Sequence, residues 1–84
     1  MHFPLMPRYF FNISNDEEIP DEEGSEIADD SAAIEWARRE VRYWAAESVK
    51  KHAHLVLHHK ITVTNEEGAE VATVRFGDII SVRD

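Results

Sequence analysis

Four of the five histidines in this chain lie within eight residues of one another, where their imidazole groups are able to do chemistry. On a strand, two imidazoles spaced two residues apart point to the same side and can share a metal ion such as zinc. The chain has no cysteine to complete such a site, and no acid lies at a recognised ligand spacing. We therefore expect an exposed cluster whose charge depends on pH between about 5 and 7, with zinc binding as the alternative. This histidine cluster consists of His52, His54, His58 and His59.

Carboxylates are concentrated in one segment. Nine acids and no base lie between Asp16 and Asp30, whereas the other residues carry eight acids and nine bases. Clustered carboxylates suit calcium, but an EF-hand loop requires glycine at its sixth position, and counting from Asp21 places Gly24 fourth. The sequence therefore favours a solvated acidic segment, with Asp29 or Asp30 capping a helix, over a calcium site. A docking surface for a basic partner is a third interpretation.

Two aromatic residues mark one side of a predicted helix. Trp36 and Tyr43 lie seven positions apart, about two helical turns, at the margin of its apolar stripe. Partly exposed aromatic side chains are typical of interface cores, although the same residues would also serve to cover the edge of a sheet. We predict a protein-binding surface formed by Trp36 and Tyr43, together with Phe10.

Basic residues follow the same helix and are interspersed with glutamates, a mixture typical of a solvent-exposed face. Binding to a phosphate backbone depends on lysine and arginine, and the net charge of −8 argues against it, so nucleic acid is not an expected partner. A nucleic-acid-linked regulator, inhibited by its own acidic segment, is the alternative function. Its contacts would come from the bases of the helix, which are Arg38, Arg39, Arg42, Lys50 and Lys51.

The sequence contains no pattern typical of an enzyme. The serines lack a surrounding nucleophile motif, the three glycines are scattered singly, and no carboxylate pair is placed for acid–base work. We therefore expect neither catalysis nor a bound cofactor.

Length and composition favour one small globular domain. The chain has 84 residues, of which 43% are hydrophobic, and a domain of this size gains stability when a second copy or a partner covers more of its surface. The absence of cysteine excludes disulfides and fits a reducing compartment. No stretch approaches the roughly 20 apolar residues of a membrane span, and the start lacks a basic signal region. We predict a cytoplasmic protein with no membrane contact.

The first elements that position these groups are a ragged hairpin and a helix. Tyr9, Phe11 and Ile13 alternate within a predicted strand over residues 8–14, and Pro20 restricts the returning segment to a short edge strand. The helix is predicted from Ala32 to about Lys51, after a cap at Asp29, Asp30 or Ser31. Its apolar stripe consists of Ala33, Ile34, Ala37, Val41, Trp44, Ala45 and Ser48.

A second hairpin follows the helix. Alternation from Leu55 to Val63 predicts a strand, the residues from Asn65 to Gly68 predict a turn, and residues 70–76 return. The expected order is β-β-α-β-β, an α+β fold in which an antiparallel sheet of two hairpins carries one helix on one face. The pairing between the hairpins is left open.

Several of these segments resemble a family of small bacterial proteins catalogued as a domain of unknown function. The resemblance is carried by the opening Met6-Pro7-Arg8-Tyr9-Phe10-Phe11, the Asp-Glu-Glu-Gly run from Asp21 to Gly24, the alanine-rich helix and the segment from Val63 to Gly68. It implies that Met1–Leu5 is an upstream extension, or that Met6 is an alternative start, and that residues 6–84 form the domain. Where such families often carry aspartate, this chain has Asn65. The resemblance implies no catalytic residues.

Taken together, these patterns favour a small binding or regulatory module that acts through protein contacts. Self-association as a homodimer is expected, because one helix is too small to cover all the remaining apolar residues. Those residues are Phe10, Val56, Ile79, Ile80 and Val82.

Overall fold

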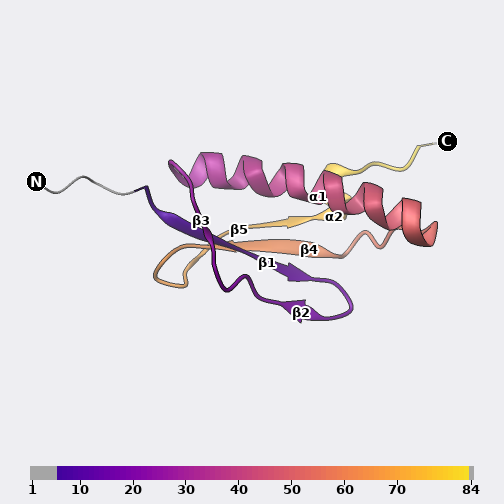
Figure 1. Cartoon of the computed structure of the whole chain (residues 1–84). Coiled ribbons are helices and arrows are strands. Elements are labelled where there is room, and N and C mark those ends of the chain that lie inside the picture. The colour runs from indigo at the N-terminus through magenta and orange to yellow at the C-terminus, as the bar shows by residue number, and fades with distance from the viewer. Residues whose placement is uncertain (1–5, 84) are drawn as a thin grey trace, which may run out of the picture.

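The computed structural model describes residues 6–83, which form one antiparallel sheet with a long helix across it (Figure 1). The predicted extension Met1–Leu5 lies outside the described residues. The predicted α+β class is confirmed: a main helix covers one face of the sheet. The elements are β1 (Arg8–Ser14), β2 (Glu18–Ile19), β3 (Ser25–Glu26), α1 (Asp30–His52), β4 (Lys60–Thr64), β5 (Glu70–Arg75) and α2 (Phe76–Ile79).

The sheet has the order β2-β1-β4-β5, and β3 also pairs with β1. β1 pairs antiparallel with β4, placing Phe11 opposite Val63, so the first strand joins the two hairpins. β2 and β3 share the other edge of β1, where Ile13 lies opposite Ile19. Alternation within a strand does not specify its neighbour, so the sequence predicts neither the order of the hairpins nor the pairing of β3 with β1.

Both ends of α1 are capped. The Asp29 carboxylate accepts a hydrogen bond from the Ala32 N–H at 2.8 Å, which makes Asp29 the N-cap among the three residues proposed from sequence. At the other end, Ala53 has a φ of 57° and donates its N–H to the Val49 carbonyl. The helix therefore matches its predicted range to within two residues at each end.

The core lies between α1 and the strands below it. The helix contributes small and β-branched side chains, which allow its backbone to lie close to the sheet. The sheet and α2 supply the larger partners, among them Tyr9, Ile61, Val63 and Phe76. The buried residues of α1 are Ala33, Ala37, Val41 and Ala45.

The strand predicted from Leu55 begins only at Lys60. In the preceding segment the His59 N–H donates to the Val56 carbonyl, so the chain turns as it descends from the helix to the sheet. Alternating apolar residues predicted an extended strand here, but local hydrogen bonds and the change of direction override that pattern. The start of this predicted strand was therefore wrong.

The end of the chain also differs from expectation. Phe76 was placed in the last strand but instead begins α2. Ile79 and Ile80 pack against the core, so the prediction that they stay uncovered is wrong, whereas Val82 is 78% exposed. Within residues 6–83, neither helix has the length and apolar character needed to cross a membrane.

Candidate binding groove

The helix α1 does not cover the whole of the sheet face on which it lies. α1 packs mainly against β4, β5 and α2 rather than β1 and β2. β1 nevertheless directs apolar side chains to this face, because Phe11 and Ile13 alternate with residues that point to the other side. Both side chains are only half-buried. A groove results between α1 and the β1–β2 hairpin.

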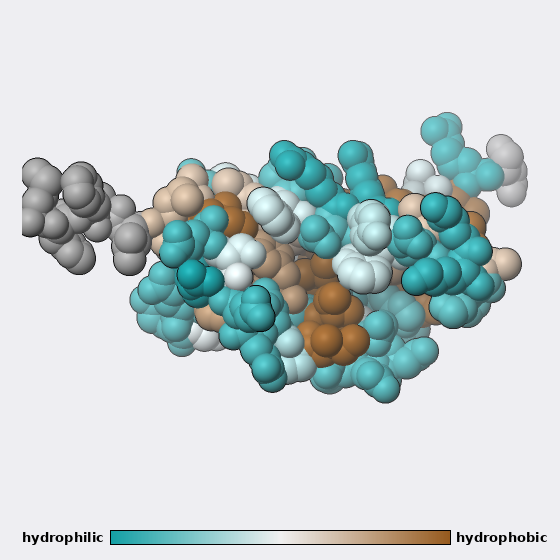
Figure 2. Space-filling model, in the orientation of Figure 1, coloured by the Kyte–Doolittle hydropathy of each residue, from teal (hydrophilic) through white to brown (hydrophobic). Residues whose placement is uncertain are grey.

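The groove has the size and lining of a ligand site. Its volume is about 640 Å³, within the range of roughly 300–1,000 Å³ that is usual for binding pockets. Figure 2 shows hydrophobic surface in the middle of this face, between the helix and the β2 strand, with hydrophilic side chains around it. The apolar lining residues are Ile13, Ile19, Trp44, Ile61 and Phe76.

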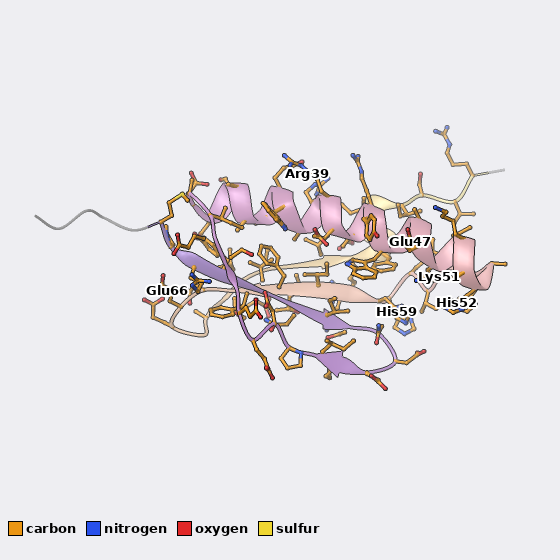
Figure 3. The ribbon with its side chains drawn as sticks, viewed as in Figure 1. Arg39, Glu47, Lys51, His52, His59 and Glu66 are labelled. Carbon is orange, nitrogen blue, oxygen red and sulfur yellow. The ribbon has the colours of Figure 1, made fainter. Side chains whose placement is uncertain are left out.

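The rim of the groove carries both signs of charge. Two acids come from the turn between β1 and β2, while α1 supplies one acid and one lysine. With neutral imidazoles, the rim has three acids against one base. Figure 3 places Glu47, Lys51 and His52 along the last turns of α1, with His59 below them. The charged and titratable lining residues are Asp16, Glu17, Glu47, Lys51, His52, His54 and His59.

His59 carries an unsatisfied polar atom in the groove wall. Its side chain is only 13% exposed, and its Nε2 atom is buried with no hydrogen-bond partner among residues 6–83. The nearest carboxylate oxygen is Asp16 Oδ1 at 3.7 Å, beyond hydrogen-bond distance, on a side chain that is 99% exposed. The ring stacks edge-on against Phe76, with the centroids 5.7 Å apart. The imidazole is therefore held in place while its nitrogen lacks a partner.

Aromatic side chains extend the groove along α1. Trp36 is 45% exposed, and its ring centroid lies 6.3 Å from that of Phe11 on β1. Tyr43 is 57% exposed and meets Trp44 edge-on at 5.3 Å. The predicted exposure of Trp36 and Tyr43 is confirmed. Trp44, at 42% exposed, was wrongly assigned to the buried stripe, because α1 does not lie above β1.

Phe10 does not belong to this surface. It points to the opposite face of β1 from Phe11, as alternation requires, and is half-buried. Its Cε1 atom lies beside Gly24, 2.9 Å from where a Cβ atom would be. The sequence grouped Phe10 with Trp36 and Tyr43, but the structure separates it from them.

The histidine cluster is divided into two pairs. His52 and His54 stack at the end of α1 with ring centroids 5.5 Å apart, and His58 meets His59 edge-on at 5.4 Å. Among residues 6–83, no three histidine or acidic side chains are grouped so that they would hold a metal ion. The described residues therefore do not provide an assembled set of ligands for the zinc alternative.

The Asp21–Gly24 run has a structural role that sequence reasoning missed. One oxygen of Asp21 accepts the Phe11 N–H at 3.1 Å, and the other accepts the N–H groups of Glu23 and Gly24. Burial pushes the pKa of Asp21 upward, but these three donors and the guanidinium of Arg8 outweigh it, so the pKa lies below its ordinary value. The carboxylate thus closes the gap between β2 and β3 along β1.

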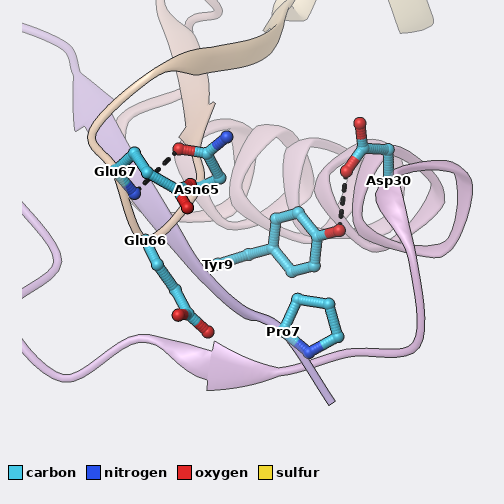
Figure 4. A pocket seen from close by; sticks show the side chains of 6 residues that line it. All are labelled: Pro7, Tyr9, Asp30, Asn65, Glu66 and Glu67. Carbon is cyan, nitrogen blue, oxygen red and sulfur yellow. Dashed lines mark hydrogen bonds between the residues drawn. The ribbon is translucent and has the colours of Figure 1, made fainter. Parts of the chain in front are cut away.

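A smaller pocket of about 380 Å³ lies at the other end of β1 (Figure 4). Tyr9 donates its hydroxyl to Asp30 Oδ1 at 2.6 Å, and Glu66 accepts the Arg8 N–H at 2.7 Å. The bond to Asp30, then burial and the neighbouring negative charges, raise the pKa of Tyr9 to about 12. These contacts tie β1 to the start of α1 and to the β4–β5 turn, which is a structural role.

The family model for a domain of unknown function named DUF6894 matches residues 8–77, from the start of β1 into α2. The chain belongs to the DUF6894 family. This confirms the resemblance to an uncharacterised domain family. All the residues that line the groove lie within the matched part of the DUF6894 domain. No curated protein and no solved structure matches the chain.

Proposed function

We propose that this DUF6894 domain is a small protein-binding module whose contact surface is the groove and its aromatic flank. The observation that carries the proposal is the off-centre position of α1, which leaves Phe11 and Ile13 of β1 only half-buried beside three exposed aromatic rings. Burying such surface is the main favourable term in protein association, and tryptophan and tyrosine are enriched among the residues that dominate binding energy.

The groove supports binding better than catalysis. Ser48 lies in its lining, and its hydroxyl donates to the His54 carbonyl at 3.1 Å rather than to an imidazole or a carboxylate. A serine nucleophile requires an adjacent base. We therefore propose no enzymatic activity. We also propose a cytoplasmic location, which the absence of cysteine supports.

Affinity capture with matched baits tests the proposal. The tagged wild-type chain is compared with Trp36→Ala/Tyr43→Ala, which removes two exposed rings, and with Arg38→Ala/Arg42→Ala, which alters the solvent-exposed side of α1. We expect a partner protein that is retained by the wild type and the arginine variant and lost by the aromatic variant. If the partner were lost only from the arginine variant, the contact would involve the basic side of α1, which would favour the nucleic-acid-linked alternative. Equal retention of the partner by all three baits would contradict the proposed surface.

A further inference from the structure

We propose that the groove binds a partner segment in which a large apolar side chain lies next to a lysine or arginine. The structural basis is the juxtaposition of an apolar floor with a rim on which acids outnumber bases. This inference rests on the proposed function and names the chemistry of the partner.

The floor of the groove provides the site for the apolar side chain. Ile19 is 44% exposed on one wall and Trp44 is 42% exposed on the other, with the half-buried Ile13 between them. The volume of about 640 Å³ accommodates one large side chain and its adjoining backbone. An apolar group placed here removes both exposed walls from water at once.

The charge around the groove selects a cationic neighbour for that apolar side chain. Asp16 and Glu17 lie exposed on the hairpin wall, and Glu47 lies on the helix wall. Lys51 is the one lysine or arginine among the described residues that line the groove. The acidic segment continues from this hairpin along the outer edge of β1. The other bases of α1 are not among the residues that line the groove. Arg39, for example, lies on the side of the helix away from the sheet (Figure 3). This distribution attracts cationic segments and repels acidic ones.

His59 adds a polar group to the wall of the groove. An imidazole nitrogen that carries no hydrogen accepts a hydrogen bond from an ammonium or guanidinium group, and the Nε2 atom of His59 has no hydrogen-bond partner among residues 6–83.

Selection from a phage-displayed library of random heptapeptides tests this chemistry without assuming a sequence. The wild-type chain should enrich peptides in which leucine, isoleucine or an aromatic residue adjoins lysine or arginine. Enrichment of acidic peptides, or of apolar peptides without a base, would overturn the inference about the partner while leaving a protein-binding module in place. Failure to enrich any peptide would overturn it as well, and the capture experiment would then decide the proposed function separately.

Synthetic versions of the enriched peptides locate the site. Trp44→Ala should abolish their binding, measured by fluorescence anisotropy of a labelled peptide. Asp16→Asn/Glu17→Gln should weaken it about threefold or more at low salt, whereas Glu22→Gln/Glu23→Gln, which removes the same charge from the acidic segment away from the groove, should change it less than about twofold. Equal weakening by both charge variants would indicate general attraction and overturn the site. If the wild-type chain formed a dimer that Trp44→Ala dissociates, the groove would be occupied by a second copy, and the inference about a cationic partner segment would be overturned.

Discussion

The Asp21 carboxylate does for β1 what a neighbouring strand does elsewhere in the sheet. Its oxygens accept three backbone N–H groups, one of which belongs to the strand itself. Asp21→Asn keeps the size of the side chain but replaces a charged acceptor with an amide that has only one acceptor oxygen. We expect the free energy of unfolding to fall by about 1–3 kcal/mol in urea denaturation. Glu22→Gln, its exposed neighbour, is the control and should be close to neutral.

The pH dependence of that loss follows from the lowered pKa of Asp21. A carboxyl group whose pKa is lower in the folded than in the unfolded chain stabilises the fold above its unfolded pKa of about 3.9, and that stabilisation disappears as the pH falls through the folded value. The stability difference between wild type and Asp21→Asn should therefore be constant near pH 7 and shrink below about pH 4. A difference that grows toward acid would contradict the role assigned to the carboxylate.

Tyr9 should titrate well above the ordinary range of a tyrosine hydroxyl. Its pKa of about 12 is raised, so the neutral hydroxyl stabilises the fold fully below the unfolded value near 10, and this stabilisation is lost as the pH rises through 12. Absorbance at about 295 nm, where the phenolate absorbs, should show a step near pH 12 that Tyr9→Phe removes and Tyr43→Phe leaves in place. A Tyr9-dependent step near 10 would show that the bond to Asp30 does not persist in solution.

At the scale of elements, two glycines in left-handed conformations differ in what surrounds them. Gly24 has a φ of +71°, and a Cβ atom there would lie 2.9 Å from the Tyr9 carbonyl oxygen. Gly68 has a φ of +80° with open space around it. Gly68→Ala should therefore cost about 1–2 kcal/mol from the backbone conformation alone. Gly24→Ala should cost clearly more, and thermal unfolding that ranks the two variants in the reverse order would contradict this account.

Strand and helix positions were largely predictable because the signals lie in neighbouring residues. Alternation of Tyr9, Phe11 and Ile13 gave β1, and the acids before Ala32 gave the start of α1. β3 could not be predicted, because it consists of only two residues, which pair with β1 directly after the turn that Asp21 holds. The turn before β4 was missed for a related reason, because, besides its local bond, the carbonyls of Leu57 and His59 accept the N–H groups of Gly77 and Phe76 in α2.

The candidate site was predictable only in part, because it depends on where the helix lies across the sheet. Periodicity identified Trp36 and Tyr43 as exposed. It assigned Trp44 to the core, since a helix centred on the sheet would have buried that position. The approach of Asp16 Oδ1 to 3.7 Å from His59 Nε2 brings together residues more than forty positions apart in the sequence, and no local pattern predicts it.

At the scale of the molecule, the uneven distribution of charge should govern how partners arrive. The net charge is −8, and nine acids without a base occupy the segment that begins at the groove. We expect the association rate of a basic partner peptide to fall steeply as salt rises from about 10 to 150 mM, while the dissociation rate changes little. Stopped-flow fluorescence separates the two rates, and a salt effect confined to dissociation would contradict steering.

Self-association remains a prediction with a narrower basis than the sequence implied. Ile79 and Ile80 are partly buried against the core, but Leu57 and Val82 are 44% and 78% exposed. We expect light scattering to show a mass above that of the monomer at high micromolar concentrations. Strictly monomeric scattering at that concentration would contradict it.

The two edges of the sheet are unequal, and this limits how copies of the chain are able to assemble. β2 and β3 occupy the two ends of the outer edge of β1. Between them, the Asp21 carboxylate accepts the N–H of Phe11. An incoming strand therefore finds no continuous row of free backbone groups on that side. Of the described strands, only β4 pairs with β5, so the outer edge of β5 stays open. A fibre that grows by strand addition needs two open edges, so any association of this kind stops at two molecules.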